Sequence, residues 1–211
     1  MTKMMTILWV KTISENYYRM LLSIGVDVGT KNGAIAVIDE DFNILHLGKA
    51  PYFEKDMAHT ARNRVKPKLN KETGKYEITY KKRSWTDFHA FRGLFKPYIA
   101  RKYKIIYTVE KVSVRPEEGE ISSFVFGNSL GCFEGLSAYL NPIFMVEPTP
   151  QTWKNEMGLS STKSNSIELA ESLFEVNLKD YVQKGKVDDI SEALLLAVYG
   201  FKKYDESTGE Q

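Results

Sequence analysis

The sequence predicts an α/β protein built on a mixed five-stranded β-sheet with helices on its faces. Two apolar, β-branched runs within residues 22–38 are joined by a Gly/Asn turn, which is typical of a hairpin of two strands. A further apolar run at residues 104–112 and amphipathic segments at helical spacing supply the rest of the pattern. At 211 residues the chain is long enough for one full core.

The first half of the chain supplies three antiparallel strands and a basic insertion. Residues 43–48 form the third strand after the hairpin. The polar, basic insertion at about residues 55–83 is interpreted as a protruding hairpin. Ser84 is placed to cap a helix over residues 85–101, whose apolar positions recur at helical spacing. These positions are Trp85, Phe88, Phe91, Leu94 and Phe95.

The second half alternates strands and helices. Strands are predicted at 104–112 and 143–148. Helices are predicted over 122–140, from Pro150, after a cap at Ser161 or Thr162, and over 190–204. A domain over residues 22–204 then follows an N-terminal extension (1–21) and precedes a tail (205–211). The extension has the features of neither a signal peptide nor a transit peptide.

Charge is distributed unevenly, although the net charge is only +2. Residues 49–104 hold 16 Lys and Arg against 5 Asp and Glu, whereas the remainder holds 13 against 22. An acidic body with a basic segment favours contact with nucleic acid, and a solvated loop is the alternative. No run approaches the roughly 20 apolar residues of a membrane span. The single cysteine, Cys132, fits a reducing, cytoplasmic environment.

Three separate segments carry carboxylates where the hydrophobic pattern predicts burial. Asp27 lies in the first strand and Glu110 at the end of the strand over 104–112. Asp188 and Asp189 precede Glu192 by four and three residues, so either can share its helix face. Oxygen ligands without His or Cys indicate Mg²⁺ or Mn²⁺. Two such ions can activate water for phosphodiester cleavage.

Simpler roles stay open for these acids. Asp188 or Asp189 could be a helix N-cap. Glu110 could pair with a buried Lys or Arg, and Asp27 could be a structural turn residue. Against the last alternative, Gly29 and Gly33 are interpreted as leaving room beside the first strand for a ligand.

Glycines at four-residue steps form one line on the predicted helix over 122–140. They are Gly127, Gly131 and Gly135. Each costs a helix about 1 kcal/mol relative to Ala, so something is expected to pack closely against that line. A second copy of the chain and the sheet of the same chain are the two candidates.

Several segments, in chain order, resemble RuvC-type Holliday junction resolvases, with the phage or bacterial RuvC-like branch the nearer likeness. They are Ile24-Gly-Val-Asp-Val-Gly-Thr, Val109-Glu-Lys-Val, Ser122-Ser-Phe-Val-Phe-Gly-Asn, Pro150-Gln-Thr-Trp-Lys and Asp188-Asp-Ile-Ser-Glu-Ala-Leu-Leu-Leu-Ala. The resemblance covers about residues 22–203. It implies a ribonuclease H-like fold, a homodimer through the Ser122–Leu140 helix, and a cytoplasmic location in a bacterial or phage-infected cell.

The same resemblance implies an activity and a set of site residues. The activity is a Mg²⁺-dependent endonuclease, with Mn²⁺ able to substitute, that resolves four-way DNA junctions by paired symmetric nicks. It assigns catalysis to Asp27, Glu110, Asp189, Glu192 and Lys163, and metal binding to the same four acids together with Asp188. DNA contacts are expected from Lys154, Lys163, Arg115, Lys81, Lys82 and Arg83. Without the resemblance, Lys154 and Lys163 would each be interpreted as a solvated lysine.

Two departures from the family pattern concern DNA recognition. Ser113 stands where the bacterial resolvases carry an aromatic residue that helps to open the junction. Phe124 or Phe126 could take that role, and a place in the core is the alternative. The basic insertion is also longer than the corresponding loop in the bacterial enzymes.

Other functions stay open. They are a relaxed branched-DNA nuclease or a ribonuclease on the same fold, and a DNA-binding protein without catalysis. The run Asp-Val-Gly-Thr also resembles the phosphate loop of sugar kinases and actin-like ATPases. Those folds duplicate the unit and need far more than 211 residues, so this alternative is weak.

Overall fold

The central sheet has five strands in the order β3-β2-β1-β8-β9. They span β1 (Leu21–Asp27), β2 (Ala34–Asp39), β3 (Ile44–Lys49), β8 (Lys104–Val109) and β9 (Phe144–Val146). The structure is a computed structural model. It describes residues 20–57, 65, 67–77, 80–113, 119–159, 163–182 and 187–209.

Strand directions make the sheet mixed, as predicted. β1 pairs antiparallel with β2, and β2 with β3, while β1–β8 and β8–β9 are parallel. Val26 pairs with Val109, and the next backbone N–H, that of Glu110, donates to the Val26 carbonyl at 3.1 Å. The carboxyl ends of β1 and β8 therefore meet at one end of the sheet.

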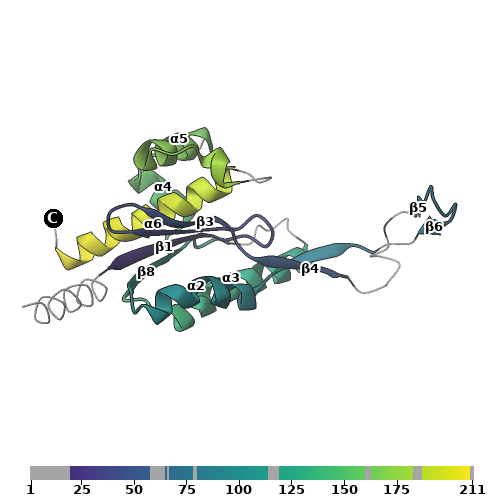
Figure 1. The fold of residues 1–211 in the computed structure, drawn as a ribbon, viewed down its shortest axis with the longest axis horizontal. Coiled ribbons are helices and arrows are strands. Elements are labelled where there is room, and N and C mark those ends of the chain that lie inside the picture. Colours follow the sequence, from purple (N-terminus) through teal and green to yellow (C-terminus); the bar gives the residue numbers. More distant parts are fainter. Residues whose placement is uncertain are drawn as a thin grey trace, which may run out of the picture.

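Helices cover both faces of the sheet (Figure 1). α2 (Phe88–Ala100) and α3 (Glu120–Leu140) lie on one face. α4 (Pro150–Glu156), α5 (Lys163–Phe174), the 3₁₀ helix η2 (Leu178–Tyr181) and α6 (Val187–Thr208) lie on the other. Each face has its own apolar cluster, because the strands are buried on both sides and each helix layer buries its apolar stripe against them.

The helix α6 packs against β1 so closely that the backbones of the two elements are in contact. A Cβ on Gly25 would meet the carbonyl oxygen of Ala193 and the backbone of Ala197. Ser23 Oγ donates to the Ala197 carbonyl at 2.6 Å. The absence of a side chain at Gly25 therefore allows α6 to pack closely against β1. This close packing helps to position the first turns of α6 relative to the end of β1.

A basic ribbon projects from the sheet (Figure 1). β4 (Tyr52–Asp56) pairs antiparallel with β7 (Lys82–Thr86), and β5 (Lys68–Leu69) pairs with β6 (Tyr76–Glu77) farther out. The predicted protruding hairpin is therefore present in the described part of the insertion. Thr86 Oγ1 holds the base of the ribbon to α3 by donating to Ser129 Oγ at 2.7 Å.

The predicted start of the helix over 85–101 is wrong. Ser84 and Trp85 belong to β7, where Trp85 pairs with Phe53. The helix begins at Phe88, and Asp87 caps it by accepting a 3.0 Å hydrogen bond from the Ala90 N–H. Trp85 fits the helical spacing by coincidence, because one aromatic residue extends a periodic pattern without showing which element carries it.

The last helix is longer than predicted at both ends. It begins at Val187, so Asp188 and Asp189 lie inside its first turn and neither is the N-cap considered from the sequence. It continues through Thr208, beyond the expected end at 204. The proposed cap at Ser161 or Thr162, and residues 1–19 of the extension, lie outside the described residues.

None of the described helices combines the length and the apolar character that crossing a membrane requires.

Candidate active site

Carboxylates from three elements come together at the carboxyl ends of β1 and β8. Asp27 is the last residue of β1, and Glu110 directly follows β8 in the adjacent register. Asp189 and Glu192 lie in the first two turns of α6, close enough to Asp27 that their charges, with that of Glu110, raise the pKa of its carboxyl. The structure thus unites residues separated by more than 160 positions in the chain.

This crowding disfavours the ionised form of Asp27. Burial raises the pKa of its carboxyl well above the usual range, and the charges of Glu110, Glu192 and Asp189 raise it further. Lys154 acts in the opposite direction and lowers the pKa. An acidic group in this state is strongly stabilised by any cation placed among the carboxylates.

Glu110 is buried and hydrogen-bonded to an indole. Trp153, in α4, donates from Nε1 to Glu110 Oε1 at 2.8 Å, and both residues are buried. Burial raises the pKa of Glu110, the Trp153 hydrogen bond lowers it, and Glu192 raises it. The partner is therefore not the buried Lys or Arg considered from the sequence.

Lys154 is the cation beside this acidic cluster. Its Nζ lies 2.8 Å from Glu192 Oε1, with side-chain exposures of 25% and 14%. The same Nζ lies 5.2 Å from the centre of the Trp153 ring, on the neighbouring residue of α4. The interpretation of Lys154 as a solvated lysine is wrong, because the side chain is three-quarters buried and ion-paired.

The two aspartates at the start of α6 have different surroundings. Asp189 raises the pKa of Asp27, whereas Asp188 is not among the charges that do so. The Asp188 carbonyl accepts a 2.8 Å hydrogen bond from Ser191 Oγ. The electrostatics therefore associate Asp189 more closely than Asp188 with the acidic cluster.

The chemistry of the cluster fits a hard divalent cation, although the side chains do not form a ready cage. All the candidate ligands are carboxylate oxygens, which Mg²⁺ and Mn²⁺ prefer. Within the described residues, no group of three or more His, Cys, Asp or Glu side chains has an arrangement that could hold an ion. Glu192 points one oxygen at Lys154 instead.

The interpretation of Gly29 and Gly33 as room for a ligand is wrong. A Cβ on Gly33 would lie 2.6 Å from the Gly29 carbonyl oxygen, and one on Gly29 would lie 2.7 Å from the Gly33 nitrogen. The backbone of the β1–β2 loop comes into close contact with itself at these two positions. The glycines permit this contact because they have no side chain, and the contact holds the backbone that follows Asp27 in place.

The predicted DNA-contacting residues are spread over several elements. Lys81 and Lys82 are exposed on the ribbon, and Arg83 is half-buried and donates to Ser122 Oγ at 3.2 Å. Lys163 is the first residue of α5, and its side chain lies outside the described part. Arg115 also lies outside it.

Phe124 and Phe126, the two candidates for a junction-opening aromatic, differ in exposure. Phe124 is 68% exposed and packs edge-on against Trp85, with ring centres 6.2 Å apart. The core alternative is therefore wrong for Phe124. Phe126 is half-buried and packs against the core beneath α3, so a role in the core stays the alternative for this residue.

Sequence reasoning missed Trp153 as a site residue, although it lies in the quoted run Pro150-Gln-Thr-Trp-Lys. The available signal was its chemistry, since a buried indole N–H needs an acceptor and the strand ends offered carboxylates.

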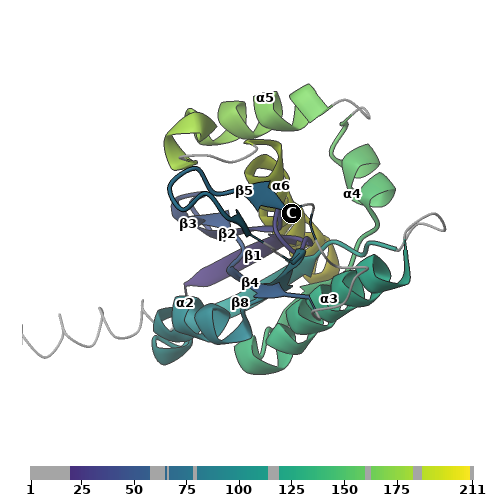
Figure 2. The same ribbon diagram turned by 90° about the vertical axis from the view of Figure 1, so that its right-hand side faces the viewer.

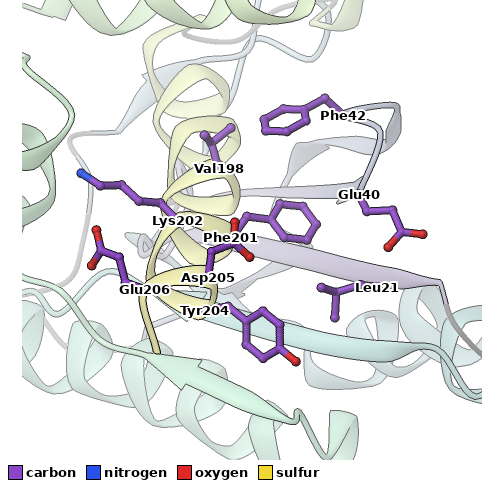
Figure 3. A pocket seen from close by; sticks show the side chains of 9 residues that line it. All are labelled: Leu21, Glu40, Phe42, Val198, Phe201, Lys202, Tyr204, Asp205 and Glu206. Atoms are coloured by element: carbon purple, nitrogen blue, oxygen red, sulfur yellow. The ribbon is translucent and has the colours of Figure 1, made fainter. Parts of the chain in front are cut away.

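A separate cavity of about 590 Å³ lies near the opposite end of α6 (Figure 3). The rings of Phe42, Phe201 and Tyr204 line it, together with acidic side chains that include Glu40 and Asp205. None of the predicted site residues lines this cavity. It therefore belongs to another surface of the molecule.

The sequence matches no protein-family model and no curated protein. Among solved structures, the chain is similar to T. thermophilus RuvC in complex with Holliday junction substrate. The sequence identity is 10% and the TM-score 0.47, over 90% of this chain and 96% of that chain. A mixed five-stranded sheet with helices on both faces is the architecture that the sequence resemblance implied.

Proposed function

We propose that this protein is a divalent-metal-dependent, structure-selective endodeoxyribonuclease that resolves four-way DNA junctions by paired symmetric nicks. The observation that carries the proposal is the convergence of Asp27, Glu110, Asp189 and Glu192 at one end of the sheet. Carboxylates that are buried or half-buried repel one another, and a purely structural site would not collect four of them. A site that binds a cation and then a phosphodiester explains both the charges and their burial.

Asp27, Glu110, Asp189 and Glu192 are the proposed ligands, with Asp188 as the alternative to Asp189. Bound Mg²⁺, or Mn²⁺ in its place, would supply an activated water and charge neutralisation at the scissile phosphate, leaving 5′-phosphate and 3′-hydroxyl ends. Trp153 holds Glu110 in place through its hydrogen bond. Lys154 offsets the acidic charge until the ligands are engaged, and its Nζ is then available to the phosphate. Lys163 is the second proposed phosphate contact.

The basic ribbon and α3 supply the proposed partner surfaces. Lys81, Lys82 and Arg83 lie on the ribbon, the last two in β7, and fit contact with the DNA backbone. On α3, a Cβ added at Gly127, Gly131 or Gly135 would meet nothing within 4 Å, so the alternative of packing inside the chain is wrong. We propose that a second copy covers this line, giving a two-fold dimer suited to paired nicks.

The test is cleavage of a mobile four-way junction in Mg²⁺, mapped to the nucleotide on all strands. The wild type should nick two opposed strands symmetrically. Asp27→Asn should abolish cleavage and keep junction binding, whereas Asp180→Asn, a charge-matched change at an exposed residue of η2, should keep both. Nicking retained by Asp27→Asn would sink the assignment of the site.

Substrate comparison separates the neighbouring functions. Equal cleavage of Y-forks and linear duplexes would favour a relaxed nuclease, and preferred cleavage of RNA would favour a ribonuclease. Binding without any cleavage in Mg²⁺ and Mn²⁺ would favour a DNA-binding protein without catalysis. Gly131→Glu should convert the dimer to a monomer in light scattering, and an unchanged mass would contradict the interface on α3.

A further inference from the structure

A second hollow is lined in part by the loop that follows Asp27 at the end of β1, and its chemistry is the opposite of that of the acidic cluster. Its volume is about 580 Å³, and residues from the β1–β2 loop, the ribbon and α3 line it. The cationic side chains in its lining are Lys31, Lys82 and Arg83, and Glu54 is the acidic one. We call this hollow the ribbon cleft. Lys31 lies in the β1–β2 loop, four residues after Asp27.

The walls of the ribbon cleft are held in fixed relation to the sheet. Arg83 Nη1 donates to Ser122 Oγ at 3.2 Å, which ties β7 to the start of α3. Three residues farther along β7, Thr86 Oγ1 donates to the buried Ser129 Oγ of α3 at 2.7 Å. Figure 2 shows β4 and α3 side by side beneath the sheet. The cationic groups are therefore placed by the fold and are not carried on a loose arm.

Lys31 is held by a partner that a phosphate can replace. Its Nζ lies 2.9 Å from Glu54 Oε1, and the side-chain exposures are 57% and 37%. Exposed ion pairs of this kind contribute between zero and about 1 kcal/mol, so exchanging the partner costs little. Lys31 and Glu54 both line the cleft, so a phosphate bound there can take the place of Glu54 as the partner of Lys31.

Hydroxyl groups and apolar side chains make up the rest of the lining of the cleft. Ser84 and Thr30 add hydroxyl groups to the three cationic side chains, and Val125 and Phe126 supply an apolar floor. Cations, hydroxyls and an open apolar floor match a nucleic-acid strand, whose phosphates are positioned by such donors while its sugars cover apolar surface.

We propose that the ribbon cleft binds the phosphodiester backbone of the strand that passes the active site, with Lys31 and Arg83 as phosphate contacts and Glu54 as the exchangeable partner of Lys31. The inference rests on the proposed function, because it takes the bound DNA strand to be the one that reaches the acidic cluster. It adds a binding track that leads from the base of the ribbon to Asp27, and it assigns Lys31 a role in positioning the substrate.

The experiment measures the affinity of a labelled four-way DNA junction as a function of salt, in the Asp27→Asn protein so that the substrate stays uncut. Lys31→Gln and Arg83→Gln should each reduce the salt slope by about one and weaken binding about fivefold at about 0.1 M salt. Lys96→Gln, an exposed charge-matched change on α2, should alter neither. Glu54→Gln should tighten binding about twofold, because it releases Lys31.

The outcomes separate the two proposals. If Lys31→Gln and Arg83→Gln keep the parent affinity and slope while the parent binds the junction, the cleft inference is overturned and the proposed function stands. If the parent binds no junction, both are overturned. An RNA junction titrated in parallel identifies the backbone, and a loss confined to RNA would overturn the assignment to DNA. Because Lys31 and Glu54 are exposed, melting curves of these two variants should match the parent.

Discussion

The indole Nε1 of Trp153 donates a 2.8 Å hydrogen bond to Oε1 of Glu110, and both side chains are buried. The bond joins the first helix after β9 to the carboxyl end of β8. It also lowers the pKa of Glu110, which burial raises. A packing residue of α4 thereby orients an acidic residue of the site and partly offsets the effect of burial on its pKa.

The substitution Trp153→Phe removes this hydrogen-bond donor and should lower the stability of the folded protein. The ring volume is largely kept, but the buried Glu110 oxygen loses its partner, so we expect a loss of about 1–3 kcal/mol in the free energy of unfolding. Trp85→Phe is the matched control, because Trp85 is half-buried on β7. Urea unfolding of both variants measures the difference, and equal losses would contradict the role given to the hydrogen bond.

Mg²⁺ should stabilise the folded protein without any DNA. A ligand that binds only the native state adds about 2.7 kcal/mol at a hundred times its Kd, so Tm should rise with the Mg²⁺ concentration. Asp27→Asn should remove most of this rise, whereas Asp180→Asn should keep it. Thermal melts in EDTA and in graded Mg²⁺ give the comparison, and an identical rise in all three proteins would place the cation elsewhere.

Two glycine substitutions should have opposite effects on stability. Gly25→Ala forces a Cβ into the backbone of α6, which cannot move away without leaving the sheet, so we expect a loss of about 3 kcal/mol or no folded protein. Gly127→Ala adds a Cβ in open space on α3 and should stabilise the helix by about 0.5–1 kcal/mol. Chemical unfolding at low protein concentration, which limits any dimer, tests both signs.

His46 should make stability depend on pH. Burial lowers its pKa below 6.5, and its buried Nε2 has no hydrogen-bond partner among the described residues. The unfolded chain then binds the proton more tightly than the folded chain. Stability should therefore fall as pH drops from about 6.5 to the lowered pKa of His46, and level off below it.

His46→Leu removes that contribution without adding a polar group. The difference in unfolding free energy between the wild type and the variant should shift in favour of the variant as pH falls below about 6.5. Unfolding curves recorded from pH 5 to 8 measure this difference, which cancels the titration of groups common to both proteins. A difference that stays constant over this range would contradict the prediction.

Much of the fold was predictable because its signals are local. The hairpin of β1 and β2, the strand β8 and the helix α3 follow from apolar runs and periodicity within single segments. The boundaries at Ser84 and Trp85 were not predictable in this way. Their strand conformation depends on pairing with β4, some thirty residues earlier, and helical spacing carries no information about that partner.

The amino-acid sequence by itself determined which acids were available, and that Asp27 and Glu110 end buried strands. Only the tertiary structure decided how they meet, because their approach depends on the parallel register of β1 and β8 and on the close contact of α6 with Gly25. The same holds for Trp153, Lys154 and the ribbon cleft. Charges that are unfavourable one at a time become a site once strand register and helix packing hold them at one end of the sheet.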